Sequence, residues 1–535
     1  MEPVTTNEQT ENINIETKNP LFKFMEIGSL IYAFFYTVFL YKNGSGITYP
    51  FFAGGTCLFF FFYLKKSGIT AKKSLLFPAI SIILLGINTC TTDSFVLIFI
   101  NKMGIFFLFF YLVIHSLYED KGWDLSKYLC SILNIICTSF LFIFRPFSDF
   151  ALFLRDKREE QNKPEGKGKY VFFGIIIAVP LLFVILLLLY EADAVFSNIL
   201  DQIFTLNFDF NLDHVFGILF LFLFAFIASY SIMCRISLHN LKEEVSDKKK
   251  LEPVMGITFT ALVSLVYLIF CYIQVFYLFG GLGTLPENYT YSSYAREGFF
   301  QLVFVCIINL VLILVCMKYF REDKILKGIL TFISLCTYIM IASSSYRMIL
   351  YIQAYDLTFL RVFVLWALFI IFLLITGALI MIYLKSFPYT KFCIITVTAL
   401  YLVFSFAHPD YWIASYNLNK EETDYYYLRH LSLDAAPAIF DHFEKSGFNS
   451  ISDLWFSEYA STMVKKSYNF QIKELDKIWL EEGDCIPKRI SLRKWNLSQY
   501  TAYQRYKNYY LLNHDFAQEI EYNIMCYTGN SLGRP

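Results

Sequence analysis

Long apolar blocks separated by short polar stretches dominate the chain. A helix needs about 20 mainly apolar residues to cross about 30 Å of hydrocarbon, and the blocks approach or exceed that length. They predict an all-α, polytopic transmembrane bundle of 11 to 12 spans. The candidate spans are residues 22–41, 49–64, 74–90, 94–118, 128–145, 170–189, 213–234, 256–280, 299–319, 329–345, 358–384 and 391–407.

Both ends of the chain differ from this pattern. Residues 1–20 are polar and predict a disordered N-terminal arm, because so few apolar residues cannot offset the entropy lost on ordering. Residues 21–407 form the expected multi-pass transmembrane domain. In residues 408–535 the apolar runs stop and fourteen tyrosines mix with charges, which predicts a small helical soluble domain. Helical patterns there cover 424–431, 435–446, 455–482 and 497–513.

The distribution of Lys and Arg predicts how the spans are oriented, because short cytoplasmic loops carry an excess of both. Residues 145–169, 235–250 and 318–327 are strongly basic, whereas residues 190–212 and 281–298 hold one basic residue between them, Arg296. We therefore expect a multi-pass protein of the cell membrane with the three basic loops in the cytoplasm. The C-terminal domain is then expected outside.

The first third of the chain conflicts with twelve full crossings. The four lysines between residues 65 and 73 also favour the cytoplasm, yet twelve crossings place them outside. Segment 74–90 is short and contains Pro78 and Asn88. We therefore expect it to form a re-entrant or interfacial hairpin that does not cross, which leaves eleven crossings and a cytoplasmic N-terminus.

Composition supports the membrane assignment and excludes several other classes. Hydrophobic residues make up 56% of the 535 residues and charged residues only 17%, so a soluble fold is nearly excluded. The net charge is zero and no basic stripe alternates with exposed aromatics, which argues against a nucleic-acid partner. Ten of the twelve cysteines lie in or beside apolar blocks, and Cys485 and Cys526 are the remaining pair, able to form one disulfide outside the cell.

The chain contains no familiar motif for a cofactor or a metal. It lacks a phosphate-binding GxxxxGK[ST] loop, and its seven histidines include no HExxH pattern. His408 and Asp410 are close enough in sequence to share a metal, but two residues are few ligands, and an interfacial hydrogen-bonding pair is the better interpretation. The sequence therefore predicts no metal and no cofactor, and it favours a protein that is not an enzyme.

The informative residues are charged and aromatic groups near the outer ends of spans. A charge near lipid costs several kcal/mol unless it is paired or hydrated. Such residues therefore predict either a polar binding belt or a salt-bridge network that only anchors helix ends, and the second interpretation is somewhat favoured. The candidate polar belt consists of Glu191, Asp193, Arg296, Glu297, Arg347, Tyr351 and Arg361.

Five segments occur in a distinctive order: Ala-Asp-Ala-Val-Phe (192–196), Tyr-Ala-Arg-Glu-Gly-Phe-Phe (294–300), Tyr-Arg-Met-Ile-Leu-Tyr-Ile-Gln-Ala-Tyr (346–355), Ile-Ala-Ser-Tyr-Asn-Leu (413–418) and Leu-Ser-Leu-Asp-Ala-Ala-Pro-Ala (431–438). Together they resemble the bacterial membrane family catalogued as domain of unknown function 4153/4173, over roughly residues 170–440. The chain departs from that family at Asp356, where Gly is expected, and at His408, where Asn is expected. The first change argues against a strict turn at 356. The resemblance implies an integral membrane architecture and no transferable activity.

These observations favour a membrane protein that binds a lipid, a protein partner or a small ligand at the outer polar belt. A transporter is one alternative, although the centres of the spans hold few ionisable residues besides Lys102. A transferase acting on a lipid-linked donor is another, because Glu191 and Asp193 offer oxygen ligands for a divalent cation. The oligomeric state is left open.

Overall fold

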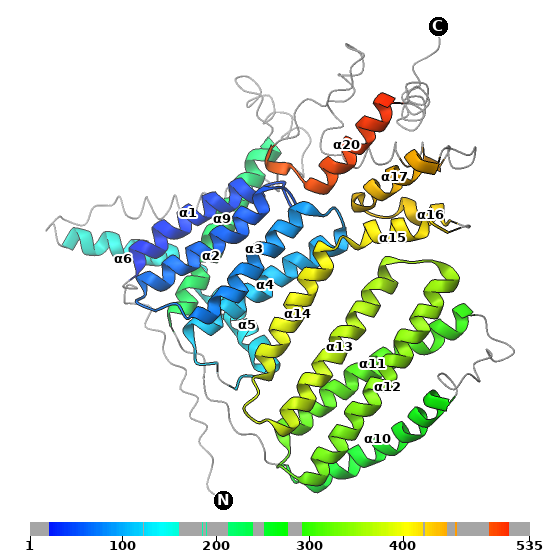
Figure 1. The fold of residues 1–535 in the computed structure, drawn as a ribbon. Helices are drawn as coiled ribbons and strands as arrows, with labels where there is room; N and C mark the ends of the chain where they lie inside the picture. The colour runs from blue at the N-terminus through cyan, green and yellow to red at the C-terminus, as the bar shows by residue number, and fades with distance from the viewer. Residues whose placement is uncertain are drawn as a thin grey trace, which may run out of the picture.

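The computed structural model describes residues 21–120, 122–159, 185, 189, 212–238, 251–276, 291–420, 423–446, 455, 456, 459 and 492–512. Within these residues every named element is an α-helix or a 3-10 helix, as Figure 1 shows, so the all-helical expectation is confirmed. The N-terminal arm, Glu191 and Asp193, and Cys485 and Cys526 lie outside the described residues.

The first half of the chain builds one group of helices. It comprises α1 (Phe22–Leu40), α2 (Thr48–Lys66), η1 (Lys73–Leu75), α3 (Leu76–Thr91), α4 (Phe95–Leu117), α5 (Leu125–Ser139), η2 (Phe140–Phe142), α6 (Arg145–Glu159) and α9 (Leu212–Ser237). Most of them share one core, in which Met25, Phe60, Tyr63, Leu85 and Leu112 are buried, whereas the apolar residues of α5 pack in a smaller cluster with the end of α4. The aromatic rings that are so frequent in the sequence fill this space.

A second group follows in the chain and has its own core. It comprises α10 (Pro253–Gln274), α11 (Tyr291–Tyr319), α12 (Lys324–Tyr355) and α13 (Phe359–Tyr383). Leu330, Ile333 and Ile375 are fully buried within it. Helix α14 (Tyr389–Phe406) lies between the two groups in Figure 1 and packs on both α13 and α3.

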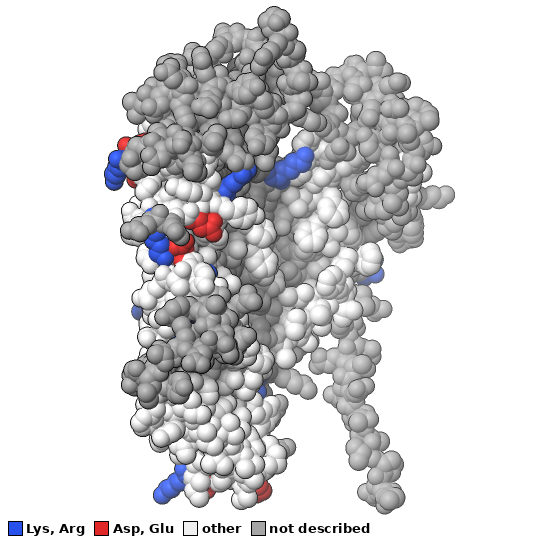
Figure 2. All heavy atoms as spheres, turned by 90° about the vertical axis from the view of Figure 1, so that its right-hand side faces the viewer, with Lys and Arg blue, Asp and Glu red and all other residues white. Residues whose placement is uncertain are grey.

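Ten described helices are long and apolar enough to cross a membrane. They match ten of the twelve sequence-predicted spans; α2 is a helix but not among the ten, and 170–189 lies outside the described residues except for residues 185 and 189. On the face drawn in Figure 2, a broad band of uncharged surface separates charged residues at the lower edge from those in the upper half. This pattern is typical of a multi-pass integral membrane protein.

One end of the helices, here called the cap end, carries the C-terminal helices. It comprises loops 41–47, 92–94 and 356–358 together with residues 407–409. Ile47 donates its backbone N–H to Trp495 O at 2.8 Å, and Leu357 donates its own to Asn417 Oδ1 at 2.9 Å. The cap end is uppermost in Figure 1.

The opposite end, here called the basic end, comprises loops 67–72, 118–124, 320–323 and 384–388 with the end of α9 and the start of α10. Lys72 Nζ donates to His115 O at 3.2 Å, and Lys385 pairs with Glu322 at 2.9 Å. A parallel bridge between Leu251 and Phe320 joins the start of α10 to the end of α11. Most short loops rich in lysine therefore gather at one end.

Segment 74–90 is not a hairpin. It forms η1 and α3 as one uninterrupted helical stretch, which begins beside Lys72 at the basic end and ends at Thr92 at the cap end. Pro78 is the third residue of α3, where its missing N–H removes no helical bond. The expectation of a re-entrant or interfacial hairpin therefore differs from the structure, and α3 runs alongside α2 and α4.

Helix α5, in contrast, has both its ends near the basic end. Asp124 caps α5 and pairs with Lys318, the penultimate residue of α11. At the other end of α5, Asn134 Oδ1 accepts from Arg235 at 2.8 Å, and Arg235 lies in the last turn of α9. Helix α9 starts at the cap end, where His214 contacts Tyr41.

The C-terminal helices pack on the cap end. They are α15 (Pro409–Asn417), α16 (Tyr425–Arg429), η4 (Leu433–Ala435), α17 (Ala436–Ser446), η5 (Leu492–Lys494) and α20 (Leu497–Leu512). Three of the four predicted helical stretches are present; 455–482 lies almost entirely outside the described residues. Asp424 caps α16 by accepting from Tyr427 N at 3.0 Å. Ile413, Ile439 and Phe440 are fully buried in a core shared with Leu357 and Phe359, so these helices are tied to the bundle.

Candidate functional site

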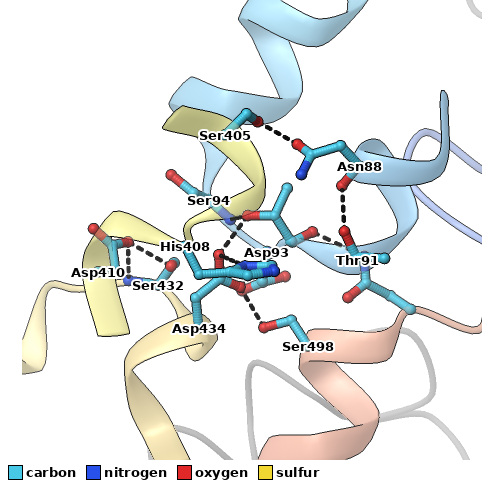
Figure 3. A network of polar contacts seen from close by, with 12 residues as sticks. Asn88, Thr91, Asp93, Ser94, Ser405, His408, Asp410, Ser432, Asp434 and Ser498 are labelled. Carbon is cyan, nitrogen blue, oxygen red and sulfur yellow. Dashed lines mark hydrogen bonds and ion pairs between the residues drawn. The ribbon is translucent and has the colours of Figure 1, made fainter. Parts of the chain in front are cut away.

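A buried carboxylate, Asp434, joins four separate parts of the chain at the cap end. Its oxygens accept from Thr92 Oγ1 at 2.5 Å, from the backbone N–H of Asp93 at 2.8 Å, from His408 Nδ1 at 3.2 Å and from Ser498 Oγ. Figure 3 shows Asp93, His408 and Ser498 around Asp434. Asp93 follows α3, His408 directly precedes α15, Asp434 lies in η4 and Ser498 lies in α20. The carboxylate thereby connects the transmembrane helices to the C-terminal helices.

These donors keep Asp434 ionised although it is almost fully buried. Burial raises the pKa of the carboxyl, but the hydrogen bonds from His408, Ser498 and Thr92 outweigh this and hold the pKa below its usual range. A buried charge is tolerated only when such partners satisfy it. The arrangement is therefore specific for a carboxylate at this position.

A second buried carboxylate, Asp410, lies close by in a different environment. It accepts from the backbone N–H of Ser432 at 3.2 Å and from Ser432 Oγ at 2.5 Å. Burial raises its pKa, the Ser432 hydrogen bonds oppose this, and the neighbouring charge of Asp434 raises it further. The predicted interfacial hydrogen bond between His408 and Asp410 is wrong in its partner, because the two residues bond to Asp434 and Ser432 instead.

The polar network continues from the cap end into the helical bundle. Asn101 Nδ2 donates to Asn88 Oδ1 at 2.8 Å, and Tyr401 donates to Asn101 Oδ1 at 2.8 Å. Ser405 Oγ also donates to Asn88 Oδ1. Asn88, Asn101 and Ser405 are fully buried, so α3, α4 and α14 are held together by side-chain hydrogen bonds in an apolar setting.

Three residues of the predicted polar belt have described side chains. Arg361 lies over the ring of Tyr351, with its guanidinium carbon 4.0 Å from the ring centroid, and donates to Tyr355 O at 2.7 Å. Arg347 is buried on α12 and donates to Gln274 Oε1 at 3.4 Å, an acceptor that it shares with Ser343. The structure thus brings Tyr351 and Arg361 together, and it joins Arg347 to α10.

The remaining belt residues lie beyond what the structure describes. Glu191 and Asp193 are outside the described residues, and Arg296 and Glu297 lie in α11 with side chains that are not described. Their clustering with Arg347 stays a prediction.

A cationic site next to Arg361 was not found from the sequence. Lys420 Nζ pairs with Asp356 Oδ1 at 2.8 Å and lies 5.3 Å from the centroid of the Tyr416 ring. Arg361 donates to the backbone oxygen of Asp356, so two cations contact the same residue. The ring of Tyr416 is exposed, and so is that of Trp412, which lies one turn earlier on α15. We call Arg361, Lys420, Trp412 and Tyr416 the cationic–aromatic surface.

The chemistry of these groups is that of binding and anchoring. Among the described residues no three of His, Cys, Asp and Glu come together as a metal site. Asp434 was not singled out as a functional residue from the sequence, although the segment Leu-Ser-Leu-Asp-Ala-Ala-Pro-Ala contains it. Its role could not be read there because its donors come from positions 92, 93, 408 and 498.

Comparison with known proteins identifies a family and nothing more specific. No curated protein and no solved structure matches the chain. A family model described as Domain of unknown function (DUF4153) matches residues 79–442, which is more than half of the chain and includes most of α3, the belt residues and Asp434. The protein is therefore a member of the DUF4153 family.

Proposed function

We propose that the protein resides in the cell membrane with its basic end in the cytoplasm and its cap end outside. The lysines of loops 65–73, 318–327 and 385–391 support this orientation, because short cytoplasmic loops are enriched in Lys and Arg. Loops 92–94 and 356–358 at the other end carry neither residue. The C-terminal helices then lie at the outer surface.

We further propose that the cationic–aromatic surface binds the anionic headgroup of a lipid in the outer leaflet. The proposal rests on one observation: Arg361 and Lys420 both contact Asp356, and Lys420 lies next to the exposed ring of Tyr416. The exposed Trp412 lies one turn before Tyr416 on α15. Two cations with one carboxylate leave a net positive charge that suits a phosphate. Trp and Tyr favour the depth of the headgroups, because their rings are apolar and their polar atoms stay hydrated.

Lipid retention after purification tests this proposal. The full chain is purified in mild detergent, incubated with phosphatidylglycerol or phosphatidylcholine, and the retained lipid is counted by native mass spectrometry. Wild-type protein should retain phosphatidylglycerol preferentially, and the double variant Arg361→Gln with Lys420→Gln should lose that preference. Lys385→Gln, an exposed lysine at the basic end, is the matched control and should retain it. Equal retention by the double variant and wild type would rule out this surface as the lipid site.

A further inference from the structure

Three side chains at the basic end form a continuous hydrogen-bonded chain from serine to histidine to aspartate. Ser74 Oγ lies 2.7 Å from His115 Nε2, and His115 Nδ1 lies 2.5 Å from Asp120 Oδ2. The same carboxylate oxygen accepts from Tyr128 OH at 2.5 Å. The histidine therefore uses one ring nitrogen for the serine and the other for the aspartate, as in serine nucleophiles activated by a general base.

The fold holds this arrangement from several elements. Ser74 lies in η1, His115 is two residues from the end of α4, and Asp120 lies in the turn before α5. Lys72 Nζ donates to the backbone oxygens of His115 and Tyr118, which ties the serine segment to the end of α4. His115 is stacked on the ring of Tyr111, with ring centroids 5.5 Å apart.

The three residues differ in solvent exposure, as catalysis by a serine nucleophile requires. His115 and Asp120 are buried, whereas Ser74 is exposed. Burial raises the pKa of Asp120, but hydrogen bonds from His115 and Tyr128 hold it below its usual range, so the carboxylate stays charged. An ionised Asp120 fixes the proton on His115 Nδ1 and leaves Nε2 free to accept the serine proton.

The surroundings of Ser74 indicate the class of substrate. Lys65, Lys66 and Lys73 are exposed on the same segment, whereas Leu76 and Ile80 are exposed apolar residues just inside α3. Ser74 therefore lies at the boundary between a cationic surface and the lipid-facing side of a helix. The acyl ester bonds of membrane lipids lie at this boundary, between the headgroup and the acyl chains.

We propose that Ser74 and His115 cleave an acyl ester of an anionic membrane lipid, with Asp120 as the positioning residue. Ser74 Oγ bonds to the acyl carbonyl carbon while its proton passes to His115 Nε2. The ester C–O bond then breaks, and the departing alcohol takes that proton. Water, deprotonated by His115, next cleaves the acyl-serine ester, so that one ester and one water give one carboxylic acid and one alcohol.

The negative charge that develops on the carbonyl oxygen during this reaction also has to be stabilised. Ser74 lies at the start of the continuous η1–α3 segment. The backbone N–H of Leu75 donates to Lys72 O and that of Leu76 donates to Lys73 O. The N–H groups of Lys73 and Ser74 come before this first bonded turn, and N–H groups at such a position stabilise a developing oxyanion. Attack at this position therefore requires no additional side chain.

Covalent labelling tests the nucleophile. The full chain in detergent is treated with a fluorophosphonate, and the labelled peptide is identified by mass spectrometry. Wild-type protein should be labelled at Ser74, and Ser74→Ala and His115→Gln should reduce labelling by at least about 100-fold. Ser67→Ala, a serine of the same loop, is the matched control and should label normally. Absence of labelling in folded wild-type protein, or labelling that survives Ser74→Ala, overturns the proposal.

Two further measurements separate catalysis from a structural role and identify the substrate. Ser74 is exposed, so Ser74→Ala should have the same melting temperature as wild type while losing activity. Asp120→Asn should lower the labelling rate and change its pH profile, which a merely structural residue would not do. Vesicles of phosphatidylglycerol should release fatty acid faster than vesicles of phosphatidylcholine. Hydrolysis of a soluble ester with no release from either vesicle would overturn the assignment to a lipid.

Discussion

Two of the three non-glycine residues with positive φ in the described chain are the two positions where the sequence departs from the family pattern. Asp356 has φ 73° and ψ 171°, and His408 has φ 48° and ψ 71°. The first conformation is favourable almost only for glycine, and the second favours asparagine among residues with a side chain. The backbone at 356 therefore adopts a conformation that favours glycine although the residue is Asp.

Replacing Asp356 by glycine should relieve this backbone strain. The strained conformation costs about 1 to 3 kcal/mol, whereas the partly exposed ion pair with Lys420 contributes about 0 to 1 kcal/mol. We expect Asp356→Gly to raise the free energy of unfolding by about 1 kcal/mol. Asp356→Ala is the control, because it also loses the carboxylate but keeps the strain, and it should not stabilise. Thermal melting in detergent measures both, and equal melting of the two variants would contradict the strain argument.

Neutralising the two buried aspartates at the cap end should have different effects on stability: the free energy of unfolding should fall for Asp434→Asn but not for Asp410→Asn. The pKa of Asp434 is lowered on folding, so its contribution to stability is present above the unfolded pKa of about 4 and is lost as the pH falls through the folded value. Asp434→Asn should cost about 2 kcal/mol at pH 7, because charge-assisted hydrogen bonds are weakened. The difference from wild type should shrink below about pH 4.

Asp410 provides the matched comparison. Its pKa is raised on folding, so its contribution to stability is greatest below about pH 4 and declines as the pH rises through the folded value. Asp410→Asn keeps an oxygen that accepts from Ser432 and removes the buried charge. We expect it to be at least as stable as wild type at pH 7. Melting curves of both variants across pH 3 to 7 distinguish the two cases. Equal losses of stability in Asp434→Asn and Asp410→Asn would contradict the argument that the two carboxylates have different environments.

The sequence indicates charged residues near the ends of spans. It does not indicate which buried polar side chains hydrogen-bond to one another. Ser74 lies in η1, His115 lies in α4 and Asp120 lies in the loop before α5, so the three residues form no local motif and the spacing of the histidines does not indicate His115. Asn88 was read as a sign of a weak span. In the structure it is a hydrogen-bonded residue of the helix core.

At the scale of elements, apolar length identified helices but could not show which of them run from end to end. Helix α5 has the length and composition of a span. Both its ends nevertheless contact groups near the basic end, Lys318 and Arg235. Helix α2 corresponds to the predicted span 49–64 and is not among the ten helices that are long and apolar enough to cross, yet it connects the cap end to the basic end. Only contacts between distant residues, which composition does not encode, distinguish these cases.

We therefore expect α5 not to cross the membrane. Glu119 precedes α5, Phe144 follows it, and both are exposed. In a cysteine-free background, Glu119→Cys and Phe144→Cys should both resist an impermeant thiol reagent applied to intact cells and react after permeabilisation. Tyr426→Cys, exposed at the cap end, is the control and should react in intact cells. Labelling of only one of the first two positions in intact cells would restore a crossing by α5.

At the scale of the whole molecule, this assignment resolves the conflict among the basic loops. If α5 does not cross, nine of the ten candidate spans remain, and the expected crossings by α2 and by the apolar stretch 170–189 bring the expected number to eleven. Eleven crossings also followed from the sequence, but with segment 74–90 excluded instead of α5. The count agrees because either exclusion places the lysines of residues 65–73 on the same side as the later basic loops.

An odd number of crossings places the two ends of the chain on opposite sides of the membrane. Helix α14 starts at the basic end, near Lys385 and Lys391, and ends at the cap end, where His408 contacts Asp434. A reporter fused after Pro535 should therefore be active only when it requires export, and a reporter fused before Met1 only when it requires the cytoplasm. Truncating the fusion after Leu384, before α14, should invert the C-terminal result, because one crossing is removed. Cytoplasmic activity of the full-length C-terminal fusion would reverse the orientation and place the cationic–aromatic surface in the inner leaflet.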